Sequence, residues 1–164
     1  PDKVFTKRTI ELSDEQQKAY SEMKANAITM LKGESSTALN VLTQLIRLHQ
    51  ITCGHMKTDS GEVINLKNSR LDELMQILGE TTGKVIIWAN YIYDIHSIEE
   101  AVKKEFGPGS YCTYYGGTKQ EDRQKCIKKF QDPENPIRFF IGNTQTGGYG
   151  ITLTEASTDR KSVV

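Results

Sequence analysis

The sequence predicts an α/β fold in which a parallel sheet lies between two layers of helices, preceded by a helical extension. Three short stretches in the second half of the chain are typical of strands, at residues 85–89, 111–115 and 137–141. The first, VIIWA, is apolar throughout, as expected for a strand buried on both faces of a sheet. Amphipathic helical patterns separate the strands, which implies right-handed crossovers and a three-layer domain over residues 69–164. Residues 1–68 are expected to form the extension and to pack on that domain.

The extension is expected to contain two helices. Ser13 and Gln16 have the spacing of a capping box, which marks the start of the first helix. Apolar residues at helical spacing predict the second helix. In order, we expect a strand at 4–12, a helix from 13 to about 32, a break at 33–36, a helix at 37–52 and a loop or short hairpin at 57–65.

From residue 69 onward, helices and strands are expected to alternate. Ser69 is the expected cap of the first helix, and Thr118 with Glu121 has capping-box spacing before a later one. Trp88 lies inside an apolar strand and is expected in the core. In order, we expect a helix from 69 to near 79, the strand at 85–89, a helix at 92–106, a turn at 107–109, the strand at 111–115, a helix at 118–130, a break at 132–136 and the strand at 137–141.

Composition excludes several classes of protein. The 164 residues carry 21 basic and 21 acidic side chains, so contact with phosphate must come from a local patch. No apolar run approaches the ~20 residues that span a bilayer, and no secretory signal pattern is visible. The three cysteines, Cys53, Cys112 and Cys126, are widely spaced, which predicts no disulfide framework and favours a reducing compartment. Because the chain begins with Pro1, we interpret it as a piece of a longer protein.

A glycine-rich segment follows the third predicted strand, with glycines at positions 142, 147, 148 and 150. Backbone N–H groups are unshielded there because glycine has no Cβ, which suits the phosphate of a nucleotide or of nucleic acid. A turn that only reverses the chain fits the same pattern. Asn90 and Tyr91 follow the first strand and residues 115–118 the second, so all three loops are expected at one edge of the sheet, where ligands bind.

Other motifs do not supply catalytic chemistry. Residues 79–84 have three residues between the glycines, and Val85 follows Lys84, whereas a Walker A loop needs four residues and then Ser or Thr. His49, Cys53 and His55 lack a second pair at ligand spacing, so no metal site is predicted. The sequence contains no motif for nucleophilic or acid–base catalysis, and no catalytic residue is assigned.

The helix after Gly117 is basic, with Lys119, Arg123, Lys125, Lys128 and Lys129. These charges fit either a grip on a phosphate backbone or a solvated helix face. Lys119 and Arg123 are the better candidates for contact because they lie near the expected functional edge.

Taken in order, the motifs resemble the C-terminal RecA-like lobe of Swi/Snf-type helicase-like ATPases of helicase superfamily two. KVIIWANY at 84–91 is similar to motif IV, and IGNTQTGGYGITL at 141–153 is similar to motif V. The other matching segments are IELSDEQQKAY at 10–20, the helix at 42–53, and YGGT at 115–118 with Arg123 and Phe130. The resemblance covers about residues 4–157.

The sequence also departs from the family pattern. Gln145 stands where the family often has Arg or Lys, Thr146 replaces Ala, Thr152 replaces Asn, and Met56 replaces the Pro after His55. Residues 158–164 match nothing expected there, and we expect neither the next strand nor motif VI. Motif VI carries the arginine fingers that stabilise charge on the transferring phosphoryl group.

The resemblance implies the second motor lobe of an ATP-dependent DNA translocase or helicase. ATP and Mg²⁺ would be held mainly by a first RecA-like lobe in cis, and Gly150 and Ile151 would face the nucleotide. Contact with double-stranded DNA would be sequence-independent, through its backbone. The implied nucleic-acid-binding residues are Asn90, Tyr91, Gly117, Thr118, Lys119, Thr144, Gln145, Gly147 and Gly148.

These 164 residues alone are expected to be monomeric, to bind no cofactor and to hydrolyse no ATP. Short connections suggest a bacterial or phage protein, cytoplasmic or nucleoid-associated. Two alternatives stay open: a non-enzymatic α/β interaction module that binds a protein or a phosphorylated ligand with the same loops, and a nucleotide-sugar or phosphosugar binding domain. A sequence Q-x-x-x-R-x-x-R after Val164 would favour the ATPase.

Overall fold

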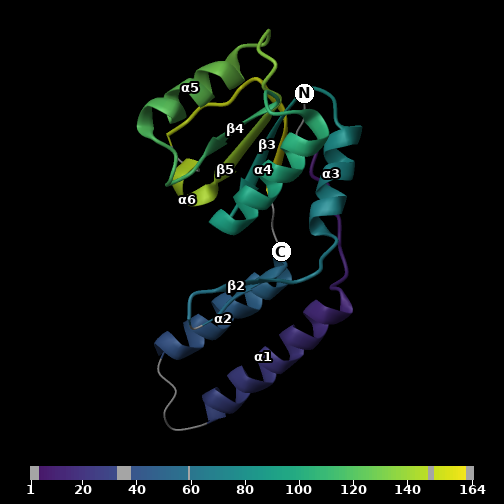
Figure 1. The fold of residues 1–164 in the computed structure, drawn as a ribbon, viewed down its shortest axis with the longest axis vertical. Coiled ribbons are helices and arrows are strands. Elements are labelled where there is room, and N and C mark those ends of the chain that lie inside the picture. The colour runs from purple at the N-terminus through teal and green to yellow at the C-terminus, as the bar shows by residue number, and fades with distance from the viewer. Residues whose placement is uncertain (1–3, 33–37, 59, 148–149, 162–164) are drawn as a thin grey trace. The chain divides into compact units, whose positions relative to one another are not determined.

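The structure is a computed structural model that describes residues 4–29, 39–58, 60–147 and 150–158 with their side chains, and the backbone alone of residues 30–32, 38 and 159–161 (Figure 1). It divides the chain into two compact units, one ending at Arg70 and one beginning at Leu71. The predicted break at 33–36 lies outside the described residues. The expected packing of the extension on the domain stays a prediction.

The first unit consists of two helices and a small hairpin. Its elements are α1 (Asp14–Lys32), α2 (Ala38–Thr52), β1 (His55–Lys57) and β2 (Val63–Asn65). The capping box is confirmed: the Gln16 N–H donates to Ser13 Oγ at 3.2 Å, and the Ser13 N–H donates to Gln16 Oε1 at 3.1 Å. The amide of the buried Gln16 also donates to the carbonyl of Ile51 at 2.9 Å, which ties the start of α1 to the end of α2.

The expected strand at 4–12 is wrong, because no described strand pairs with these residues and they stay irregular. Val4 and Phe5 are 88% and 91% exposed, so the loose alternation there has no core to face. The loop or hairpin expected at 57–65 is a hairpin, in which β1 and β2 pair antiparallel with His55 opposite Asn65.

The second unit alternates helices and strands, as predicted. Its elements are α3 (Arg70–Glu80), β3 (Lys84–Ala89), α4 (Ile92–Phe106), β4 (Tyr111–Tyr114), α5 (Gln120–Gln131), β5 (Phe139–Asn143), α6 (Thr144–Gly147) and β6 (Ala156–Lys161). The strands form one sheet in the order β4-β5-β3-β6, and every pair is parallel. Helices α3 and α4 cover one face and α5 covers the other (Figure 1), which confirms the three-layer α/β fold.

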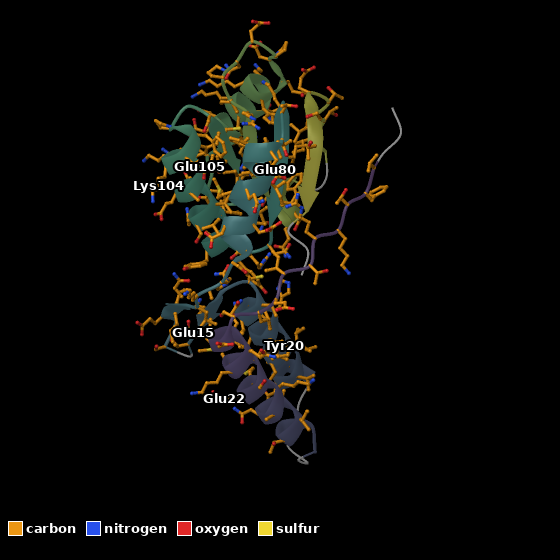
Figure 2. The ribbon with its side chains drawn as sticks, turned by 90° about the vertical axis from the view of Figure 1, so that its right-hand side faces the viewer. Glu15, Tyr20, Glu22, Glu80, Lys104 and Glu105 are labelled. Carbon is orange, nitrogen blue, oxygen red and sulfur yellow. A yellow bond between two sulfur atoms is a disulfide. The ribbon has the colours of Figure 1, made fainter. Side chains whose placement is uncertain are left out.

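The alternation of side chains along β3 builds both layers of the core. Val85, Ile87 and Ala89 face α3 and α4, whereas Ile86 and Trp88 face α5. Both sets are buried, which explains why this strand is apolar throughout. The prediction that Trp88 lies in the core is confirmed. Charged residues of the helices project outward, as Lys104 and Glu105 do at the end of α4 (Figure 2).

Two predictions about strands need correction. The expectation of no strand after residue 157 is wrong, because Ala156–Lys161 forms β6 and pairs parallel with β3. The strand expected at 137–141 begins later, at Phe139. The Ile137 N–H is taken by the side chain of Asn135 at 3.2 Å, which holds the chain in a turn until that point.

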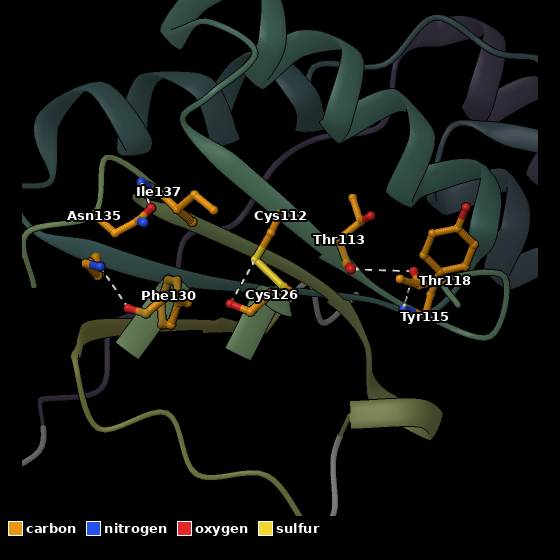
Figure 3. The surroundings of a disulfide bond; sticks show 9 residues. Cys112, Thr113, Tyr115, Thr118, Cys126, Phe130, Asn135 and Ile137 are labelled. Carbon is orange, nitrogen blue, oxygen red and sulfur yellow. Dashed lines mark hydrogen bonds between the residues drawn. A yellow bond between two sulfur atoms is a disulfide. The ribbon is translucent and has the colours of Figure 1, made fainter. Parts of the chain in front are cut away.

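The prediction about cysteines is wrong for one pair. Cys112 of β4 and Cys126 of α5 form a disulfide, with Cα atoms 5.6 Å apart (Figure 3). The strand and the helix pack together, and this proximity is not visible from the spacing of the cysteines along the chain. Cys53 is buried and is not part of the disulfide. No helix in the described ranges is long and apolar enough to span a bilayer.

Candidate nucleic-acid interface

The carboxyl ends of β3 and β5 are joined by a polar network centred on Asn143. Its side-chain amide donates to the carbonyls of Ala89 at 3.1 Å and Asn90 at 2.9 Å. Its Oδ1 accepts the N–H of Gln145 at 2.9 Å. Thr144 Oγ1 donates to Asn90 Oδ1 at 3.1 Å. The structure therefore brings together two loops that the sequence placed at the same edge.

Asn143 was not among the predicted site residues. It is buried, with 8% of its surface exposed, and each polar atom of its side chain has a partner. An Asn at the end of an apolar strand, directly before a loop, is the only sequence signal that points to this role.

The glycine-rich segment begins as a helical turn, α6, and not as the irregular loop that was expected. Asn143 caps this turn through the Gln145 N–H, which explains where the strand stops. Gln145 is exposed and Gly147 is buried. Gly148 lies outside the described residues, so its proposed contact is neither supported nor opposed.

Two of the glycines make room for Trp88. A Cβ at Gly142 would lie 2.7 Å from Trp88 Cζ3, and a Cβ at Gly147 would lie 2.8 Å from the same atom. Either distance is too short for a real contact, so glycine at these positions serves packing. Gly150 differs: it is exposed, has a φ of 78° and has nothing within 4 Å of a Cβ.

The loop after β4 is held in shape by its own side chains. Thr118 Oγ1 accepts the N–H of Tyr115 at 3.3 Å and donates to the carbonyl of Thr113 at 3.4 Å (Figure 3). Arg123 donates from Nε to the carbonyl of Thr118 at 2.8 Å and from Nη2 to the carbonyl of Gly116 at 3.0 Å. We call residues 115–119 the β4–α5 loop.

The capping box expected at Thr118 is wrong. Helix α5 begins at Gln120 with Lys119 as its N-cap, and no side chain caps it. The Thr118 hydroxyl is engaged within the loop instead. Arg123 was, with Lys119, the better candidate on this helix for a phosphate contact. In the structure it donates two hydrogen bonds to carbonyls of the loop and so positions the loop.

The predicted site residues differ in exposure. Asn90, Gly117, Lys119, Gln145 and Gly150 are exposed at the ends of the strands. Tyr91, Thr118, Thr144 and Ile151 are half-buried. Ile151 packs against the core beneath α5, so little of its side chain can face a nucleotide.

The side chain of Lys84 makes structural contacts with backbone carbonyls and does not line a phosphate site. Its Nζ donates to the carbonyl of Phe130 at 2.8 Å and to that of Asp132 at 2.5 Å. Gly83 before it has a φ of 85° and ends the turn after α3. Among the described residues, no group of three or more His, Cys, Asp and Glu side chains is arranged to hold a metal ion.

A second polar cluster links α4 to β4. The Tyr111 hydroxyl donates to Glu99 Oε1 at 3.1 Å, and His96 Nδ1 lies 3.5 Å from Glu99 Oε2. Burial raises the pKa of Tyr111 above its usual 10.0, and the carboxylate of Glu99 raises it further through its charge and its hydrogen bond. The rings of His96 and Tyr115 meet edge to face, with centroids 5.6 Å apart.

The parallel sheet, its two layers of helices and the polar loops at its carboxyl edge define a RecA-like lobe. The chain belongs to the helicase conserved C-terminal domain family, whose profile matches residues 66–158. This result and the relatives below confirm the resemblance to Swi/Snf-type helicase-like ATPases.

The chain is similar to curated relatives of this type. It is 27% identical to an uncharacterized ATP-dependent helicase of Mycoplasma genitalium, over 95% of this chain and 15% of that protein. It is 36% identical to the chromatin-remodeling ATPase INO80 of Neurospora crassa, over 62% of this chain and 5% of that protein. The chain thus spans a small part of these relatives. Because they come from fungi as well as Mycoplasma, they do not support a source restricted to bacteria or phage.

Solved structures share the fold. The Sulfolobus solfataricus SWI2/SNF2 ATPase C-terminal domain superposes with a TM-score of 0.72 at 24% identity, over 93% of this chain and 68% of that chain. The C-terminal part of the Fun30 ATPase domain superposes with a TM-score of 0.65 at 17% identity, over 94% of this chain and 73% of that chain.

Proposed function

We propose that this chain is the second motor lobe of a Swi/Snf-type ATP-dependent translocase and that it contacts the backbone of double-stranded DNA. The observation that supports this most is the junction of Asn90, Asn143 and Thr144, which presents polar groups from two neighbouring strand ends together. Parallel α/β sheets bind ligands at this edge. Because the chain belongs to the helicase C-terminal domain family, we propose nucleic acid as the ligand.

The proposed contacts come from three loops. Thr144 and Gln145, with the N–H groups of Gly147 and Gly148, would bind phosphate after β5. Gly117, Thr118 and Lys119 would make a second contact in the β4–α5 loop, where Lys119 supplies an exposed positive charge. Asn90 and Tyr91 would contribute after β3. Contacts of this kind read the backbone and are sequence-independent.

ATP and Mg²⁺ would be held mainly by a first RecA-like lobe in cis. The open space beside exposed Gly150 fits the close approach of a nucleotide, whereas the partly buried Ile151 fits it less well. Bound ATP would supply the free energy for movement along DNA. The residues of this chain would exclude water at the junction of the lobes and orient the DNA strand. We place the parent protein with DNA in the cell, cytoplasmic or nucleoid-associated if it is bacterial.

Fluorescence anisotropy with two duplexes of unrelated sequence tests this proposal. We expect weak binding of both duplexes that falls as salt rises. Lys119→Gln should weaken binding and lower the slope of log affinity against log salt by about 1. Lys104→Gln is the matched control, since Lys104 is exposed at the far end of α4, away from the carboxyl edge (Figure 2).

Absence of binding at low salt would remove the DNA-contact role from this lobe. An equal effect of Lys104→Gln and Lys119→Gln would show that binding depends on overall charge and not on the proposed edge. The same samples should hydrolyse no ATP, and turnover above that of a Gln145→Ala variant would contradict the need for a first lobe.

A further inference from the structure

We propose that Cys112 and Cys126 are a reversible thiol–disulfide site whose oxidised form restrains the β4–α5 loop. The restraint itself is independent of what the loop binds. Its consequence for DNA rests on the function proposed above.

The position of the pair singles out this loop. Cys112 lies in β4, the edge strand of the sheet, and Cys126 lies in α5, which packs on it (Figure 3). The bond closes a ring of chain between two cysteines that are 14 positions apart. That ring contains the whole β4–α5 loop, including exposed Gly117 and Lys119.

The surroundings of Cys112 and Cys126 also accommodate the two cysteines in their reduced state. Cys112 Sγ lies 3.6 Å from the carbonyl oxygen of Cys126, so a free Cys112 thiol has an acceptor at hand. Cys126 is 4% exposed and packs beside Phe130, Ile137 and Phe140, where a small apolar thiol is well accommodated. Reduction therefore removes a restraint without leaving an unsatisfied polar group in the core.

Arg123 transmits the restraint to the loop. It lies one helical turn before Cys126 and donates to the carbonyls of Gly116 and Thr118. The disulfide fixes that turn of α5 against β4 and so keeps Arg123 over the loop. In the reduced protein, the hydrogen bonds of Arg123 and Thr118 and the packing of α5 hold the loop without a covalent bond.

Glutathione disulfide is the oxidant that we propose, by two exchange steps. The half-buried Cys112, as thiolate, attacks one sulfur of glutathione disulfide, forms a mixed disulfide and releases one glutathione thiolate, which takes up a proton. The Cys126 thiolate then attacks Cys112 Sγ and displaces the second glutathione. The two cysteines lose two electrons and two protons, and two molecules of glutathione are formed.

The test equilibrates the 164-residue chain in glutathione buffers from reducing to oxidising. Peptide mapping identifies the bond, and hydrogen exchange measures the amides of residues 116–119. We expect a Cys112–Cys126 peptide that appears and disappears reversibly with the buffer, exchange in the loop about tenfold slower when oxidised, and a melting temperature about 10 °C higher. Cys53→Ser, in the other unit, should behave as the wild type.

Three results would overturn the proposal: no Cys112–Cys126 peptide in any buffer, a bond that reducing glutathione cannot break, or loop exchange that is the same in both states. Cys112→Ser should match the reduced wild type, and the reduced wild type itself serves if that variant does not fold. DNA affinity is measured in parallel. Loss of DNA binding in both states would contradict the proposed function, while the exchange data would still decide the redox restraint.

Discussion

Replacing Gly147 by Ala should destabilise the second unit, because the indole ring of Trp88 occupies the space that the new methyl group needs. The added Cβ would lie 2.8 Å from Cζ3 and 3.0 Å from Cη2 of Trp88, and 3.2 Å from Cδ1 of Tyr114. The ring has little room to retreat. The Cβ position of Gly142 is 2.7 Å from the same Cζ3 atom, and the ring of Phe140 packs edge to face with a centroid distance of 5.9 Å.

The size of the effect follows from two opposing terms. Overfilling a packed core costs about 1–3 kcal/mol. Alanine gains up to about 1 kcal/mol over glycine in a helix, and less in a turn as short as α6. The net loss of unfolding free energy should therefore be about 1–2 kcal/mol. Gly79→Ala is the matched control: Gly79 lies in α3 with nothing within 4 Å of a Cβ, so this change should be neutral or stabilising.

Urea unfolding followed by tryptophan fluorescence measures this difference. Trp88 is the only tryptophan of the chain, so the signal reports the second unit alone. Combining Gly147→Ala with Trp88→Phe, measured by circular dichroism, should recover part of the loss because the smaller ring frees space. The reasoning is refuted if Gly147→Ala is as stable as the wild type, or if the double variant shows no coupling between the two positions.

Three further predictions concern the polar contacts. Because the pKa of Tyr111 is raised in the fold, its contribution to the free energy of unfolding is fully present below the unfolded pKa of 10.0 and is lost as pH rises through the folded pKa. Tyr111→Phe should therefore make the urea midpoint depend less on pH above that value. Asn143→Ala should cost about 2–3 kcal/mol of unfolding free energy, since one buried carbonyl, one partly buried carbonyl and one N–H lose their partner; a cost near zero would contradict the network. Arg123→Lys keeps the charge but loses the two-carbonyl geometry, so hydrogen exchange in the β4–α5 loop should accelerate, whereas Lys125→Gln should leave it unchanged.

The fold could be predicted because its strongest signals are local. The apolar run of β3 and the helical spacing of α4 each determine an element without knowledge of its neighbours. Even so, β5 began at Phe139 and not at residue 137, because a side-chain contact from Asn135 decides where pairing starts.

Elements that depend on a distant partner could not be predicted. The sequence of β6, ASTDRK, is polar, and only the backbone of β3 beside it makes it a strand. Residues 4–12 show the converse, an alternating pattern with no described strand to pair with. The disulfide likewise depends on the packing of α5 on β4, which the separation of Cys112 and Cys126 does not reveal.

The location of the candidate site could be predicted from the sequence, but the contacts within it could not. The parallel sheet was sufficient to bring Asn90 and Thr144 to one edge. It was not sufficient to show that Gly142 and Gly147 accommodate Trp88, because the orientation of the indole ring is set by tertiary packing. The engagement of Arg123 with the loop carbonyls also depends on tertiary geometry.

Hydrogen exchange of the chain with and without duplex DNA at low salt tests the central claim most directly. We expect DNA to slow exchange at residues 90–91, in the β4–α5 loop and in α6, with no change in the β1–β2 hairpin. Slower exchange confined to the first unit, or spread evenly over the backbone amides of α5 with none at Asn90 or α6, would contradict the proposal that the carboxyl edge of this sheet holds the DNA backbone.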